Sequence, residues 1–263
     1  MNFNLLKIEE INNIYNIILN DPKNQNTLSE EMINELQTAV KNGETKKKIN
    51  VILISSTGKV FSAGHNLKDL NSKRYEKDKG KEYYKRIFKL CSELMININN
   101  CSKPIIAVVD GIATAAGCQL ISSCDLAYSS NRSQYATPGV NIGLFCSTPM
   151  VPLSRNVAKK HAMEMLLTGD LINAEKAKSI GLINDIFEPE KLNNKVIEIA
   201  SKIASKSKTT IKIGKKAFYE QKEMSLEDAY NYTSKIMAEN MLHQDSEEGI
   251  SAFLEKRTPN WKE

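Results

Sequence analysis

The chain has 263 residues, of which 41% are hydrophobic and 25% charged, as is usual for a globular protein of one large domain or one domain with an appendage. Its formal net charge of +5 is spread along the sequence without interleaved aromatic residues, so nucleic acid is not an expected partner, whereas an anionic ligand is compatible with the charge. The apolar runs, such as 105–109, are far too short to span a membrane, which is therefore not an expected partner either.

The N-terminal segment predicts a strand pair followed by an amphipathic helix. Residues 1–20 mix β-formers with Asn and should form the strand pair, which ends at Asp21-Pro22. Thr27-Leu-Ser-Glu30 is typical of a capping box, in which Thr27 and Glu30 satisfy each other's free N–H groups. Gly43 is expected to stop the helix. The predicted buried face consists of Met32, Ile33, Leu36, Ala39 and Val40.

Strands and helices continue to alternate up to about residue 145. Buried strands are predicted at 51–55 and 105–109, and a third strand at 125–129. A helix is expected over 80–99, and a short apolar helix should begin near Ala115 or Ala116. Continuously apolar strands that alternate with helices favour a parallel sheet covered on both faces, so the predicted fold class is α/β.

Beyond that point the pattern is almost entirely helical. A short strand is predicted at 181–186, and the last fifty residues should form at least three amphipathic helices. The predicted organisation is an α/β core over 1–200 and a helical region over 201–263. One apolar stripe in the last helices indicates either core packing or a subunit interface, and it consists of Met237, Met241 and Leu242.

The cysteines and the N-terminal residues indicate the cellular compartment of the protein. The five cysteines form no Cys-x-x-Cys pair and the three histidines are far apart in the sequence, so no metal site is predicted. The odd cysteine count, together with a first segment that has no signal-peptide pattern, predicts reduced thiols in the cytoplasm. The mitochondrial matrix stays open as an alternative if a transit segment precedes these residues.

Two loops of small residues follow buried strands and are the candidate sites of chemistry. The first is Phe61-Ser-Ala-Gly-His-Asn-Leu67, and the second runs from Asp110 to Gln119. Small residues let a ligand approach the backbone closely, and the second loop opens a helix whose free N–H groups face whatever binds there. Two N–H groups aimed at one point make an oxyanion hole. The alternative is that both loops are ordinary turns whose small residues serve packing.

Four segments together resemble one known family. They are FSAGHNLKDL (61–70), the stretch 104–130, YATPGVNIG (135–143) and the stretch 247–261. In this order, over nearly the whole chain, they are similar to the enoyl-CoA hydratase/isomerase, or crotonase, superfamily. The resemblance implies a spiral of β-β-α turns with a helical trimerisation region that also closes the coenzyme A site. It also implies an acyl-CoA thioester as ligand, no prosthetic group, coenzyme A as part of the substrate, and a homotrimer or dimer of trimers.

The resemblance also implies roles for individual residues. The oxyanion donors correspond to the backbone N–H groups of His65 and Ala116, beside Gly64 and Gly117. Such donors stabilise the negative charge that develops on a thioester oxygen when the thioester is attacked or enolised. Coenzyme A contacts correspond to Lys23, Gln25, Ala63 and Leu67, with Phe253 and Lys256 reaching the nucleotide end, in the same or a neighbouring subunit.

The sequence departs from the family at the acid/base positions. Hydratases of this family use two glutamates, and the corresponding residues here are Gln119 and Gly139. The amide of Gln119 can orient a water but cannot take its proton near neutral pH, and Gly139 has no side chain. Hydration by two carboxylates is therefore not expected. The register rests on the matching anchors Gly117, Asp125, Pro138 and Gly143.

Replacement chemistry has several candidates, each with a structural alternative. The His65 imidazole is either a general acid/base or a cap of the following turn. Cys146 is either a nucleophile or a buried inert thiol, and Asn141 can hold a water. Asn66 is expected to stabilise its turn, and Asp125 to accept structural hydrogen bonds. Three functions stay open: an acyl-CoA enzyme without the glutamate pair, a non-catalytic acyl-CoA binder, and a thiol-dependent enzyme.

Overall fold

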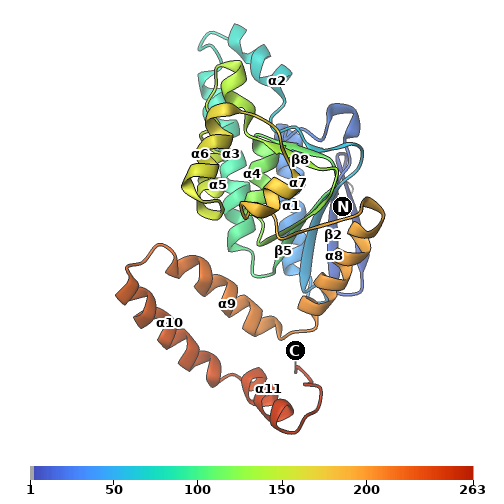
Figure 1. Ribbon diagram of the computed structural model, residues 1–263, viewed down its shortest axis with the longest axis vertical. Coiled ribbons are helices and arrows are strands. Elements are labelled where there is room, and N and C mark those ends of the chain that lie inside the picture. The colour runs from blue at the N-terminus through green and yellow to red at the C-terminus, as the bar shows by residue number, and fades with distance from the viewer. Residues whose placement is uncertain (1–2, 263) are drawn as a thin grey trace.

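The computed structural model describes residues 3–262, and it contains a large and a small β-sheet (Figure 1). The large sheet has the order β1-β2-β3-β5-β7-β10, from β1 (Leu6–Ile11), β2 (Ile14–Leu19), β3 (Val51–Ser56), β5 (Ile105–Val109), β7 (Leu126–Ser130) and β10 (Asp185–Phe187). The small sheet has the order β4-β6-β8-β9, from β4 (Val60–Ser62), β6 (Ile112–Thr114), β8 (Gln134–Ala136) and β9 (Ile172–Asn173).

The strands follow a repeating pattern that joins the two sheets. The pairs β3–β4, β5–β6 and β7–β8 each place their first strand in the large sheet and their second in the small one. The β1–β2 pair is antiparallel, whereas every other pair in the large sheet is parallel. The α/β class is confirmed, and the strand pair predicted before Asp21 is β1–β2.

Helices follow most of these strands. They are α1 (Glu30–Thr45), α2 (Leu67–Ser72), α3 (Lys81–Asn100), α4 (Ala116–Ser123), α5 (Met150–Asn156), α6 (Lys159–Thr168), α7 (Ala174–Ser179), α8 (Pro189–Ala204), α9 (Lys208–Gln221), α10 (Leu226–Met241) and α11 (Gln244–Leu254). Short 3-10 turns lie at Pro22–Asn24, Lys73–Tyr75 and Pro138–Ile142. In this described part of the chain, no helix is long and apolar enough to cross a bilayer.

The large sheet is covered on both faces, as the continuous apolar strands predict. Ile52 and Ile54 of β3 pack in the main core with α1, α3 and α4. Val51 and Leu53 of the same strand face the other way, toward Val196 and other residues of α8. This alternation follows from the two-residue period of a strand. The five residues predicted for the inner face of α1 are all buried.

Two local predictions about α1 are wrong. The N-cap is Ser29, whose Oγ accepts the N–H of Met32 at 3.2 Å, so the predicted capping box of Thr27 and Glu30 is not the cap. Gly43 does not end the helix, which continues to Thr45. A Cβ at Gly43 would lie 2.8 Å from Cδ1 of Tyr15, so this glycine lets α1 lie close against the sheet.

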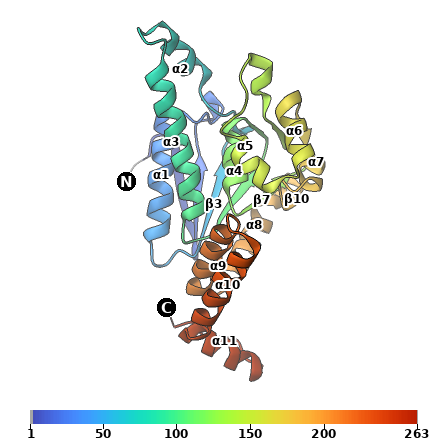
Figure 2. The same cartoon turned by 90° about the vertical axis from the view of Figure 1, so that its left-hand side faces the viewer.

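The C-terminal helices project from the α/β body, as Figures 1 and 2 both show. Their apolar side chains are exposed, including Met237 (62%), Met241 (50%) and Leu242 (89%). The prediction that this stripe packs in the core of the chain is therefore wrong, and a shared exposed apolar face is typical of a protein–protein interface. Whether 1–200 and 201–263 act as separate domains stays a prediction.

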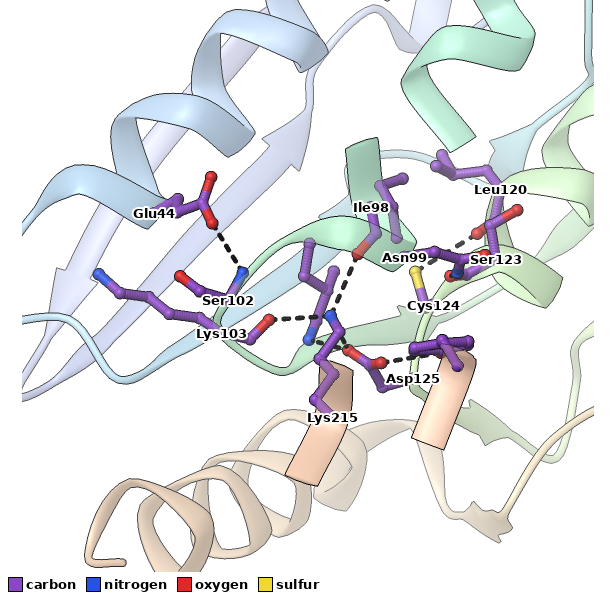
Figure 3. Close-up of polar contacts among 12 residues, drawn as sticks. Glu44, Ile98, Asn99, Ser102, Lys103, Leu120, Ser123, Cys124, Asp125 and Lys215 are labelled. Carbon is purple, nitrogen blue, oxygen red and sulfur yellow. Dashed lines mark hydrogen bonds and ion pairs between the residues drawn. The ribbon is translucent and has the colours of Figure 1, made fainter. Parts of the chain in front are cut away.

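A buried ion pair joins α9 to the body (Figure 3). Lys215 Nζ donates to Asp125 Oδ2 at 2.7 Å, and also to the carbonyl oxygens of Ile98 at 3.1 Å and Lys103 at 3.0 Å. The other carboxylate oxygen of Asp125 accepts the Tyr219 hydroxyl at 2.9 Å. The N–H of Ile105 in β5 also donates to Asp125 Oδ2, at 2.7 Å. Asp125 is thus the structural acceptor that was expected, and its two side-chain partners come from α9, at least 90 residues further along the chain.

Candidate active site

A cavity of about 560 Å³ opens where the two small-residue loops meet the turn after β8, which is the usual size of a pocket for a small ligand. The predicted site residues that line it are His65, Ala116, Gly139, Ala63, Leu67, Asn141 and Cys146. No Asp, Glu, Lys or Arg is among the described residues in its wall. A second cavity of about 610 Å³, between the end of α1 and the start of α9, contains none of the predicted site residues.

The first loop is tied to the segment before α1. Ala63 donates its N–H to the Gln25 carbonyl at 3.1 Å, and Leu28 donates its N–H to the Gly64 carbonyl at 2.8 Å. His65 Nδ1 lies 3.1 Å from the Leu28 carbonyl. Gly64 has φ +84°, a left-handed conformation that favours glycine. These contacts hold the loop along one side of the cavity.

The second loop leads into α4 through a sharp turn. Ala115 has φ 49° and ψ −116°, and its N–H donates to the Ala136 carbonyl of β8 at 3.0 Å. The hydroxyl of Thr114 donates to the Ala63 carbonyl at 3.1 Å, which joins the two loops directly. Within residues 3–262, neither the His65 N–H nor the Ala116 N–H donates a hydrogen bond to another residue, so both are free for a ligand.

Gly64 and Gly117 act by their small size and do not line the cavity. A Cβ at Gly64 would lie 3.0 Å from the nitrogen of Ala116. A Cβ at Gly117 would lie only 2.2 Å from the carbonyl oxygen of Ser62 in β4. Both contacts involve backbone atoms, so the two small-residue loops approach this closely only because glycine has no side chain.

Gln119 and Gly139, the two residues that the resemblance aligns with the family's glutamates, differ in their surroundings. Gln119 is buried (3% exposed) and does not line the cavity, and its Oε1 has no hydrogen-bond partner among the described residues. Gly139 does line the cavity. A Cβ there would lie 2.7 Å from the Leu144 carbonyl oxygen and 2.9 Å from Cys146 Sγ. The chain's own 144–146 turn thus fills the space beside position 139.

The His65 imidazole does not cap α2, because Asn66 does so. Asn66 Oδ1 accepts the N–H groups of Lys68 and Asp69 at 3.0 and 3.4 Å, as expected of a turn-stabilising residue. The His65 ring lies edge-on to Phe88, with centroids 5.2 Å apart. Burial lowers the pKa of His65 below its ordinary value of 6.5, against a smaller raising effect of the Leu28 carbonyl. The ring is therefore neutral at pH 7.

This lowered pKa predicts an acid-sensitive contribution to stability. Below pH 6.5 the unfolded chain protonates His65 before the folded chain does, so the free energy of unfolding should fall by up to about 1.4 kcal/mol per pH unit until the folded-state pKa is reached. Urea unfolding between pH 7.5 and 5 measures this slope. His65→Asn should reduce the slope, because it removes the buried ring whose protonation the folded chain resists. Equal slopes in wild type and His65→Asn contradict the prediction.

Cys146 lines the cavity but is buried (7% exposed). Burial raises the pKa of its thiol, against a smaller lowering effect of the Gly139 backbone. A nucleophilic cysteine needs a lowered pKa and access, so this environment favours the inert alternative. The other four cysteines are also buried and free.

The state of Cys146 can be checked by labelling. A maleimide added to native protein at pH 7 should leave Cys146 unmodified, whereas all five cysteines should react in denaturant. Peptide mass spectrometry locates the labels. Rapid labelling of Cys146 in the native protein would contradict this prediction and favour the thiol-dependent mechanism.

The remaining residues predicted to contact coenzyme A lie in two places, near the first loop and at the C-terminal helix α11. Gln25 lies against the first loop through its carbonyl, and Lys23 is exposed in the short 3-10 turn two residues before it. Phe253 is 82% exposed on α11, and Lys256 follows that helix. Neither lines the cavity of its own chain, so a role at the coenzyme A site would require a neighbouring subunit.

Asn26 has a structural role that the sequence patterns did not indicate. Its side chain is fully buried, accepts the Asp21 N–H at 2.8 Å, and donates to the carbonyls of Thr57 and Val60 at 2.9 and 2.8 Å. Gln25 and Asn26 both have left-handed φ values, 57° and 49°, which cost energy unless the surroundings hold them. An Asn between a strand and a helix is a weak signal for such a role, because Asn is common in turns.

The chain has known relatives in sequence. Residues 9–263 match the profile of the family described as enoyl-CoA hydratase/isomerase, and the chain belongs to this family. It is 44% identical over 252 residues to the human protein named enoyl-CoA hydratase domain-containing protein 3, mitochondrial, covering 96% of this chain and 82% of that protein. It is also 33% identical over 254 residues to the mitochondrial enoyl-CoA hydratase of Pongo abelii, covering 96% and 85%.

Solved structures agree with the sequence relatives. The crystal structure of human enoyl coenzyme A hydratase domain-containing protein 3 superposes with a TM-score of 0.92 at 44% identity, covering 98% of this chain and all of that one. An enoyl-CoA hydratase from Mycobacterium smegmatis superposes with a TM-score of 0.93 at 41% identity, covering 98% and 99%. The crotonase-like fold that the motifs implied is thereby confirmed.

Proposed function

We propose that the protein binds an acyl-CoA and holds its thioester oxygen between the N–H groups of His65 and Ala116. The observation that carries the proposal is the cavity wall, where both residues occur and where neither N–H has a protein acceptor among the described residues. Preorganised donors in a partly dry site stabilise charge on the thioester oxygen at no cost of reorganisation. The family membership supports a thioester as the ligand.

The activity that fits this site is a thioester reaction that depends on carbonyl polarisation, of the hydratase/isomerase kind but without the two-glutamate mechanism. Gln119 lies outside the cavity wall, and Gly139 has no side chain. The second candidate is a non-catalytic acyl-CoA binder, which the wall without Asp, Glu, Lys or Arg favours. No prosthetic group is needed by either, since coenzyme A enters as part of the substrate.

Three measurements test the proposal and separate its two forms. Calorimetry with octanoyl-CoA should show binding, and infrared difference spectra with 1-¹³C-octanoyl-CoA should show a lowered thioester C=O stretching frequency in the complex. Absence of binding, or an unshifted carbonyl, contradicts the proposal. Turnover on a panel of enoyl-, hydroxyacyl- and malonyl-type CoA thioesters then identifies an enzyme, whereas binding without turnover on the panel identifies a binder.

Restoring the glutamates should not produce an efficient hydratase. Gly139→Glu introduces a Cβ within 3 Å of the Leu144 carbonyl and of Cys146 Sγ, and such overpacking costs about 1–3 kcal/mol. We therefore expect the double variant Gln119→Glu, Gly139→Glu to unfold more easily than Gln119→Glu alone and to hydrate crotonyl-CoA no faster. A large gain in hydration would show that the 144–146 turn moves aside readily, and that only the acid/base pair is missing.

We further propose a homotrimer or dimer of trimers built through α9–α11. The exposed apolar side chains of these helices support an interface, among them Leu226, Tyr230, Leu242, Phe253 and Leu254. Light scattering coupled to size-exclusion chromatography measures the mass of the particle, and a monomer contradicts this part of the proposal.

The mitochondrial names of the relatives favour the mitochondrial matrix over the cytoplasm as the location of this protein. Imaging of the full-length tagged protein decides between these two locations.

A further inference from the structure

We propose that the imidazole of His65 is a positioning residue, which holds the backbone N–H of His65 in place by a hydrogen bond to Leu28 and transfers no proton itself. This inference rests on the proposed thioester site and assigns the side chain of one donor residue a separate task. It replaces both alternatives that the sequence left open for the ring, a general acid/base and a cap of the following turn.

The tautomer follows from the partner of the ring. His65 Nδ1 lies 3.1 Å from the Leu28 carbonyl oxygen, and a carbonyl oxygen can only accept, so Nδ1 carries the hydrogen. Nε2 is then the lone-pair nitrogen of a neutral ring. It is buried and has no hydrogen-bond partner among the described residues. A proton added there would create a buried charge without a partner, which is costly.

Burial also keeps Nε2 from serving as a base. The atom is shielded from solvent, and Phe88 packs edge-on to the ring. A general base must come within hydrogen-bond reach of the proton that it removes. In this position the lone pair has no such access, although other atoms of His65 line the cavity.

The hydrogen bond completes a two-point attachment of the donor loop. Leu28 donates its own N–H to the Gly64 carbonyl at 2.8 Å and accepts from His65 Nδ1 at 3.1 Å. One bond fixes the Gly64 carbonyl, which precedes the His65 N–H, and the other fixes the His65 side chain, which follows it. Donors of an oxyanion hole must lie about 2.7–3.1 Å from the developing charge, so loss of one attachment lets the N–H drift out of range.

The chain allows a matched set of substitutions at this position. His65→Asn can place its Nδ2 where Nδ1 lies, and so can keep the donor to Leu28. His65→Leu keeps much of the apolar volume and has no donor. His65→Gln places its amide near the former Nε2 position, where no acceptor lies. The backbone N–H remains in all three variants.

The readout is the infrared frequency of the bound 1-¹³C-octanoyl-CoA carbonyl, with calorimetry for affinity. We expect His65→Asn to keep most of the wild-type shift, whereas His65→Leu and His65→Gln lose most of it. All three should bind octanoyl-CoA within about tenfold of wild type, because most contacts with the ligand are retained. If His65→Leu does not fold, His65→Gln makes the same comparison.

The outcomes separate this inference from the proposed function. A wild-type shift retained in full by His65→Leu or His65→Gln overturns the positioning role and leaves the thioester site standing. Equal loss in His65→Asn also overturns it, because a donor to Leu28 would then not suffice. A wild-type protein that binds no acyl-CoA, or shows no carbonyl shift, removes the proposed function and the inference together.

Discussion

Lys215→Ala should lower the free energy of unfolding by about 3–5 kcal/mol, because it leaves a buried carboxylate without its cationic partner. The side chains of Lys215 and Asp125 are only 8% and 16% exposed and lie 2.7 Å apart. Removing Lys215 also leaves the carbonyls of Ile98 and Lys103 without this donor. Urea unfolding at one fixed protein concentration measures the change.

The neighbouring lysine provides the control. Lys216 is 71% exposed and lies 3.8 Å from Glu220 one turn away, and such a surface pair contributes about 0.3–0.5 kcal/mol. Lys216→Ala should therefore change stability very little. A loss below about 1 kcal/mol for Lys215→Ala would mean that water reaches Asp125 and replaces the ammonium group. The contact would then not be what holds α9 against the body.

Gly117→Ala should disrupt the site through the contact between its two loops. The new Cβ would lie 2.2 Å from the Ser62 carbonyl oxygen and 2.9 Å from its carbonyl carbon. Because Ser62 is fully buried in β4, the first turn of α4 has to move and carries the Ala116 N–H with it. Overpacking of this kind costs about 1–3 kcal/mol of stability, and the loss of one oxyanion donor costs about 3–4 kcal/mol of charge stabilisation.

The measurements are thermal unfolding and the carbonyl frequency of bound 1-¹³C-octanoyl-CoA. We expect a lower midpoint and loss of most of the carbonyl shift. The control is Gly214→Ala, at a helical position with nothing within 4 Å of the added Cβ. This change should raise stability by about 0.5–1 kcal/mol, because alanine loses less backbone entropy than glycine in a helix. Wild-type behaviour of Gly117→Ala would show that the two loops separate at no cost.

Much of the fold follows from local patterns in the sequence. The apolar strands at 51–55 and 105–109 and the inner face of α1 are found where periodicity places them. The small sheet could not be predicted in this way. Its strands have two or three residues each, which is too short for an alternating pattern to be recognised. The family resemblance supplied the fold that these strands complete.

In the candidate site, too, some features could be predicted from the sequence and others could not. Both small-residue loops and the two donor positions could be selected from the sequence and the resemblance. The partner of the His65 ring could not, because Leu28 lies 37 residues away. The obstruction beside Gly139 was equally hidden, since nothing local indicates that the Leu144 carbonyl folds back against it. Contacts between distant segments depend on how the elements pack.

The sequence by itself determined that the chain carries Gln119 and Gly139, and no glutamate, at the positions that the resemblance aligns with the family's acid/base pair. The identity of these two residues is sufficient for that conclusion, because neither Gln nor Gly has a carboxylate in any fold. The sequence also placed the two proposed donor residues after two buried strands. Only the tertiary structure decided which groups surround the donors. The Leu28 carbonyl orients the His65 ring, and the Ser62 carbonyl sets how closely α4 approaches the first loop. Both contacts involve backbone carbonyl groups of residues that are distant in the sequence, so no local pattern indicates them.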